Sequence, residues 1–111
     1  MNQPDRYRET ISSYRKHGWQ LRRVLICERT RSDFAVLSEL DLDGIEPEAT
    51  SVDALWFARP SHAGREAWEL RLIGDTPYAL FEAFEADCDE DVREETLREM
   101  QARLIDYATR D

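Results

Sequence analysis

Residues 55–70 read LWFARPSHAGREAWEL, and this stretch decides the fold that the sequence predicts. Two runs rich in apolar residues flank a break that contains proline and glycine. The second run alternates apolar and charged residues, which is typical of an antiparallel strand with one buried face. We therefore expect strands at Val52–Arg59 and Ala67–Ile73, joined as a hairpin by the loop Pro60–Glu66.

Strands and helices are also predicted on both sides of this hairpin. Trp19–Arg29 and Tyr78–Glu85 are rich in aromatic and aliphatic residues and are expected to be strands. A helix is predicted at Pro4–His17, because apolar residues recur there at helical spacing and Gly18 can end it. A second helix is predicted at Asp89–Ala108. Its apolar stripe contains Val92, Thr96, Leu97, Met100, Leu104 and Tyr107.

The segment Asp33–Asp43 fits either a strand or a helix, and the short polar stretch before it favours the strand. The residues that follow contain Gly44 and Pro47 and are expected to form a loop. The predicted order is α-β-(β)-β-β-β-α in one domain, residues 1–111. The fold class is therefore α+β: a mostly antiparallel sheet of four or five strands, with the N- and C-terminal helices packed on one face.

The chain carries an excess of acidic residues. Its 111 residues include 15 Lys and Arg against 24 Asp and Glu, which gives a net charge of −9. This charge repels nucleic acids and anionic membranes, so neither is expected as a partner, whereas a basic protein is favoured. No apolar run is long enough for a signal peptide or a membrane span, so we expect a cytoplasmic protein. All basic residues except Lys16 are arginine, which we interpret as the codon usage of a GC-rich bacterial genome.

No motif for catalysis or for cofactor binding is recognisable. The sequence lacks the nucleotide-binding, serine-hydrolase and zinc-protease motifs, so we expect neither an enzyme nor a cofactor. Cys27 and Cys88 are too few for a disulfide framework and lack the spacing of a zinc site. The acidic residues from Asp87 to Asp91 begin like a calcium-binding loop, but Val92 stands where that loop needs glycine. No metal site is therefore expected.

The hairpin at residues 55–71 carries a cluster of residues that suggests an alternative function, as a binder of small anions or as an enzyme. Arginine binds carboxylates and phosphates in a bidentate manner, and histidine and tryptophan lie near the arginines in this sequence. The alternative interpretation is a solvated hairpin tip above a core that contains tryptophan. The candidate ligand-binding residues are Trp56, Arg59, His62, Arg65, Trp68 and Arg71.

With both helices on one face, the other face of the sheet would be open, and we favour this face as the functional surface. Mixed charged and apolar faces of this kind often form interfaces. We therefore expect a non-catalytic interaction module that forms a homodimer through its sheet. The predicted open face carries Arg22, Val24, Ile26, Glu69, Arg71 and either Leu80 or Phe81.

In its size, its acidity and its helix at each end, the chain resembles the small acidic chaperones of bacterial type III secretion. Those chaperones dimerise and bind partner chains, so the resemblance implies a chaperone-like or inhibitory role toward a basic protein. They also carry a helix within the strand series, and no such helix is placed in this sequence.

Overall fold

The computed structural model describes residues 2–32 and 42–110 of the chain. Most of its elements lie within a few residues of their predicted positions. In chain order the elements are α1 (Gln3–Lys16), β1 (Gln20–Ile26), α2 (Glu28–Arg31), β2 (Glu48–Ala49), β3 (Ala54–Pro60), the 3₁₀ turn η1 (His62–Gly64), β4 (Glu66–Leu72), β5 (Ala79–Phe84) and α4 (Glu90–Thr109).

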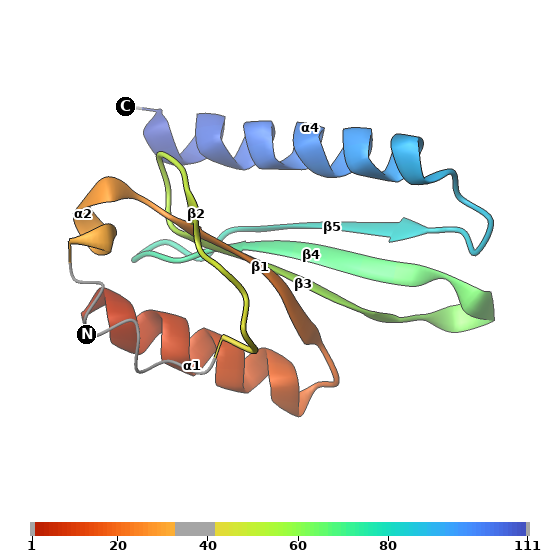
Figure 1. Cartoon of the computed structure of the whole chain (residues 1–111), viewed down its shortest axis with the longest axis horizontal. Coiled ribbons are helices and arrows are strands. Elements are labelled where there is room, and N and C mark those ends of the chain that lie inside the picture. The colour runs from red at the N-terminus through yellow and green to blue at the C-terminus, as the bar shows by residue number, and fades with distance from the viewer. Residues whose placement is uncertain (1, 33–41, 111) are drawn as a thin grey trace.

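The strands form one sheet in the order β2-β1-β3-β4-β5 (Figure 1). Each neighbouring pair from β1 to β5 is antiparallel, and β2 is the exception, because it runs parallel to the end of β1. The predicted α+β class with a mostly antiparallel, five-stranded sheet and a helix at each end is therefore confirmed.

Local sequence signals explain where the two long helices begin and end. The Asn2 side chain accepts a hydrogen bond from the backbone N–H of Asp5 and so caps α1. Gly18, which has a positive φ of 84°, follows the last turn of α1. The Asp89 side chain caps α4 through the N–H of Asp91, with acidic residues in the first turn where the helix dipole favours them.

One half of the hydrophobic core lies between α1 and the sheet. Tyr7 and Ile11 of α1 pack against β1 and β3, and the Tyr7 hydroxyl donates a 2.6 Å hydrogen bond to the backbone carbonyl of Leu25. Burial, followed by the nearby carboxylate of Asp53, raises the pKa of Tyr7 well above its ordinary value. This cluster also contains the strand residues Leu21, Val24, Ile26, Leu55 and Phe57, and Ile73 just after β4.

The other half of the core lies between α4 and the opposite face. Leu97, Met100 and Leu104, which are the buried members of the predicted α4 stripe, pack against the sheet. Val92, at the start of the same predicted stripe, is instead 55% exposed. The sheet residues of this second cluster include Leu25, Ala54, Trp56, Ala58, Trp68, Leu70 and Phe84.

The prediction that both helices pack on one face is wrong. Figure 1 shows α1 and α4 on opposite sides of the sheet. The reason lies in β3, which is apolar on both faces: Leu55 and Phe57 point toward α1, whereas Trp56 points toward α4. A strand of this kind needs cover on each side, and the two terminal helices provide it. Val24 and Ile26, which were expected on an open face, are buried under α1.

The segment between β1 and β3 contains the remaining differences. Most of Asp33–Asp43, where the sequence favours a strand, lies outside the described residues. The fifth strand is β2, within the region predicted as loop. The predicted strand Trp19–Arg29 ends at Ile26, and the short helix α2 follows it.

Candidate functional site

The two long helices are displaced sideways from one another, in addition to lying on opposite faces. α1 contacts β1, whereas α4 contacts β4 and β5. Within residues 2–32 and 42–110, no helix covers the α1 side of β5, and β5 is also the outermost strand on its side of the sheet. We call this surface the β5 face and define it as the side chains of Ala79, Phe81 and Ala83 together with the free backbone edge of the same strand. All three side chains are exposed, and Phe81 is exposed to 58%.

The alternation of the β5 sequence places Phe81 on this face. Leu80 and Phe84 pack toward α4, and the ring of Tyr78 stacks on that of Tyr107 with centroids 3.8 Å apart. Since side chains in a strand alternate between faces, fixing these residues against α4 turns Phe81 to the other side. The sequence leaves open whether Leu80 or Phe81 lies on the open face, and in the structure it is Phe81.

Tyr14 forms the boundary between α1 and the β5 face. Its ring stacks on Phe57 at a centroid distance of 4.0 Å, and its hydroxyl donates a hydrogen bond to the carboxylate of Glu69. Burial and this hydrogen bond raise the pKa of Tyr14 to about 12. Phe57, Glu69 and Phe81 lie side by side across β3, β4 and β5. The cover of α1 thus reaches Glu69, a predicted open-face residue, and stops before Phe81.

Charged side chains near the β5 face are mainly acidic. Glu82 is exposed on the other side of β5, and Asp87 is exposed just beyond the strand. Glu85 is also exposed and forms a 2.9 Å ion pair with Arg65. On β4, Arg71 lies beside Ala79 and Glu69 lies beside Phe81. The β5 face is therefore an apolar patch whose margin is mainly acidic, with Arg71 at one end.

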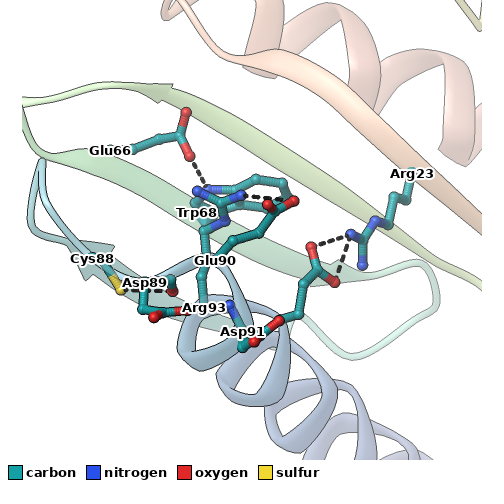
Figure 2. Close-up of polar contacts among 9 residues, drawn as sticks. Arg23, Glu66, Trp68, Cys88, Asp89, Glu90, Asp91 and Arg93 are labelled. Carbon is teal, nitrogen blue, oxygen red and sulfur yellow. Dashed lines mark hydrogen bonds and ion pairs between the residues drawn. The ribbon is translucent and has the colours of Figure 1, made fainter.

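The two tryptophans of the candidate anion site lie close together but serve the core. Their rings meet edge to face at 6.0 Å on the α4 side, and both are buried. The indole N–H of Trp56 donates to Gln101 of α4. The indole N–H of Trp68 donates to Glu66, as Figure 2 shows. Both indole donors are therefore satisfied within the protein.

Two neighbouring arginines also belong to this structural cluster. The Arg22 guanidinium lies 4.9 Å from the centre of the Trp68 ring, on the α4 side, so this residue is not on the predicted open face. One guanidinium nitrogen of Arg23, Nη2, donates to both carboxylate oxygens of Glu94 in α4, at 3.0 and 3.1 Å (Figure 2). The β1–β3 pairing has a register shift between Leu21 and Arg23. This shift interrupts the alternation of side chains between the two faces, so Arg22 and Arg23 both lie on the α4 side.

The polar members at the hairpin tip point in different directions. Arg59 donates to the backbone carbonyl of His17 at 2.8 Å and lies over the ring of Trp19. Arg65 pairs with Glu85, and His62 is exposed in η1. Arg59, His62 and Arg65 line neither the cleft beside Arg71 nor the cleft beside Asp53. Whether they bind a ligand stays a prediction.

Arg71 lies on the α1 side of β4, on the opposite face from the two tryptophans. Together with Arg6 it lines a cleft of about 310 Å³, to which α1 contributes the hydroxyl groups of Thr10, Ser13 and Tyr14. Within the described part of the chain, Arg71 forms no ion pair, and its buried Nε has no hydrogen-bond partner. Arg71 is therefore a predicted site residue that does line a polar cleft.

A buried carboxylate network lies near the end of β1 and was not identified from the sequence. Asp53, which is 7% exposed, accepts hydrogen bonds from the Cys27 N–H at 2.8 Å, the Thr30 hydroxyl at 2.5 Å and the Gln3 amide at 2.8 Å. These contacts tie α1, the start of α2 and the beginning of β3 together. A second cleft, of about 710 Å³, is lined by the same residues. Because the donors to Asp53 are neutral groups of the fold itself, we interpret the network as structural.

Three further findings bear on function. Among residues 2–32 and 42–110, no group of three His, Cys, Asp or Glu side chains could hold a metal ion. Neither long helix of the described chain has the apolar length needed to cross a bilayer. We find no significant match between this protein and protein-family models, curated proteins or solved structures.

Proposed function

We propose that this protein is a non-catalytic interaction module that forms a homodimer through the β5 face. The observation that carries the proposal is Phe81, a large apolar side chain held in the open at the centre of an edge strand. Edge strands present unpaired backbone N–H and C=O groups that can pair with another chain. β5 lacks the lysine, the proline and the bulge with which proteins usually protect such an edge.

The expected dimer is weak and depends on concentration. Fully burying a phenylalanine contributes about 1.5–3 kcal/mol, and each new backbone hydrogen bond contributes about 0.5–1.5 kcal/mol. Association costs about 4–15 kcal/mol in lost translational and rotational freedom. With an association cost near the lower end of this range, two copies of Phe81 and one strand pairing give a dissociation constant in the micromolar to millimolar range.

Sedimentation equilibrium of the full chain from about 5 to 500 µM tests the proposal. Phe81→Arg should weaken dimerisation at least tenfold, whereas Val92→Arg should not weaken it. The two variants are matched, because both replace an exposed apolar residue and both reduce the net charge of −9 by one. General electrostatics would favour the dimer in both cases, so a loss confined to Phe81→Arg must arise at the β5 face. Equal association of the wild type and Phe81→Arg would refute the proposal.

Salt separates the homodimer from the alternative of a basic partner, which the acidic margin of the β5 face favours. Two copies with a net charge of −9 repel each other, so raising NaCl from 50 to 500 mM should strengthen a homodimer. The same salt should weaken binding to a basic protein. A wild-type chain that stays monomeric at both salt concentrations leaves the basic partner as the better candidate.

A second candidate function is the binding of a small anion in the Arg71 cleft. The Arg71 guanidinium, whose buried Nε has no hydrogen-bond partner, and the hydroxyl groups of Thr10 and Ser13 are suitable donors for a carboxylate or phosphate. Titration with inorganic phosphate should then shift the NMR resonances of Ser13 and Tyr14 and leave those of His62 unchanged. Arg71→Gln should abolish these shifts. Unchanged resonances up to 20 mM phosphate, roughly the weakest affinity of interest, would exclude this function.

A further inference from the structure

The backbone hydrogen bonds of β4 identify which groups of β5 face outward. Leu72 N–H donates to the carbonyl of Tyr78 at 2.9 Å, and the same register continues to Glu66 opposite Phe84. In an antiparallel pair, residues alternate between those bonded to the neighbouring strand and those directed away from it. Leu80 and Glu82 therefore direct their backbone groups toward β4. The backbone groups of Ala79, Phe81 and Ala83 are directed to the free edge.

The same three residues thus provide both the open side chains and the unpaired backbone groups. This coincidence restricts how two copies can pair. Two identical β5 edges that pair antiparallel are related by a twofold axis perpendicular to the sheet, so each residue faces one on the same side of its strand. The axis must therefore pass through a residue, and the candidates near the strand centre are Leu80, Phe81 and Glu82.

Phe81 is the position that uses the edge most completely. With the axis there, Ala79 of one copy lies opposite Ala83 of the other, and about six backbone hydrogen bonds form. With the axis at Leu80 or Glu82, one residue with outward backbone groups is left outside the paired strands, and about four bonds remain. An axis at Glu82 also places two carboxylates directly opposite each other, which is unfavourable.

We infer that the partner strand is β5 of a second copy, with the Phe81 residues facing each other across the twofold axis. This inference rests on the proposed function and specifies its register. The two phenylalanine rings lie together on the α1 side of a continuous ten-stranded sheet, flanked on each side by an alanine pair. Glu82 lies opposite Leu80 of the other copy, so no two carboxylates face each other within the paired strands.

Disulfide cross-linking of two single-cysteine substitutions tests the register while retaining Phe81. Ala79→Cys and Ala83→Cys proteins are oxidised separately and as an equal mixture, and linkages are identified by peptide mass spectrometry. Directly paired residues of this type have Cα atoms about 5.5 Å apart, within the range of a disulfide. Native Cys27 and Cys88 give the same background in every sample.

The mixture should yield a 79–83 disulfide at least ten times faster than either protein forms a link between two copies of its own introduced cysteine. An axis at Leu80 or Glu82 would place Ala79 or Ala83 opposite Phe81, so the mixture would show no such advantage. If the chain dimerises through Phe81 without this cross-link, the register is wrong and the proposed function stands. If Phe81→Arg does not affect dimerisation, both the register and the proposed function are wrong.

Discussion

Removal of the Asp53 carboxylate should destabilise the protein because it leaves buried donors without partners. In Asp53→Ala, the Thr30 hydroxyl and the Cys27 N–H each lose their main acceptor. A buried donor left unsatisfied costs about 1–3 kcal/mol. Gln3 keeps a second acceptor, the carbonyl of Ile73 at 2.9 Å, so its loss is small. Because water can reach part of this site through the 710 Å³ cleft, we expect a total of about 3 kcal/mol.

Urea denaturation measures this effect. The urea midpoint should fall by about 1–3 M, given a typical dependence on urea of about 1–3 kcal/mol per molar. Because small proteins have about 5–15 kcal/mol of stability, the variant should remain folded. Thr30→Val is the matched partner, since it removes the hydroxyl group with little change in shape, and it should cost about 1 kcal/mol.

The double variant provides the decisive comparison. With Thr30 already replaced by valine, Asp53→Ala no longer leaves a buried hydroxyl without an acceptor. The double variant should therefore be more stable than the sum of the single effects predicts by about 1 kcal/mol. Additivity within about 0.3 kcal/mol would show that Asp53 and Thr30 do not form the proposed network.

The remaining predictions concern alkaline stability and the hairpin tip. The pKa of Tyr14 is raised to about 12, so the stability it provides is present below pH 10 and is lost as the pH rises from 10 toward 12. After allowance for its partial exposure this amounts to about 1 kcal/mol, and denaturation of Tyr14→Phe between pH 9 and 11 should show a correspondingly shallower decline. A decline as steep as that of the wild type would contradict the assignment to Tyr14. Ala63 has a φ of 58°, so Ala63→Gly should raise the free energy of unfolding by about 0.5–1 kcal/mol; a lowered melting temperature would contradict this. Gly64→Ala should lower the free energy of unfolding, because φ is 76° and the new Cβ would lie 3.3 Å from Cβ of Ala86. Thermal melts that show no difference from the wild type would refute this expectation.

Much of the fold follows from periodicity and from turn residues. The alternation in β4 and β5, the cap at Asp89 and the break around Pro60 locate the main elements to within a few residues. These signals are local, and a sequence pattern reports them directly.

The placement of the helices is a property of the whole sheet. The residues of β3 are apolar on both of its faces, which is typical of a strand that is buried on both sides. Such a strand needs a covering element on each face, so two helices on one face cannot satisfy it. The residues of the predicted hairpin site are not all brought together, for a related reason. Nearby sequence positions such as Trp68 and Arg71 lie on opposite faces of one strand, so sequence proximity does not bring their side chains together.

The Asp53 network had no local signal, because its members come from segments far apart in the chain. Gln3 and Asp53 are separated by 50 positions, and only the folded sheet brings them into contact. Phe81 is the contrasting case. Its strand and its alternation could be read from the sequence, but its exposure depends on the sideways displacement of α1 from α4.

Residue-resolved amide hydrogen exchange by NMR tests the β5 pairing most directly. At about 10 µM protein, the amides of Leu80 and Glu82 should be protected by β4, whereas those of Ala79, Phe81 and Ala83 should exchange rapidly. As the protein concentration rises toward 1 mM, protection should appear at Ala79, Phe81 and Ala83 and change little at the other two. Equally rapid exchange of these three amides at every concentration would contradict strand pairing through β5.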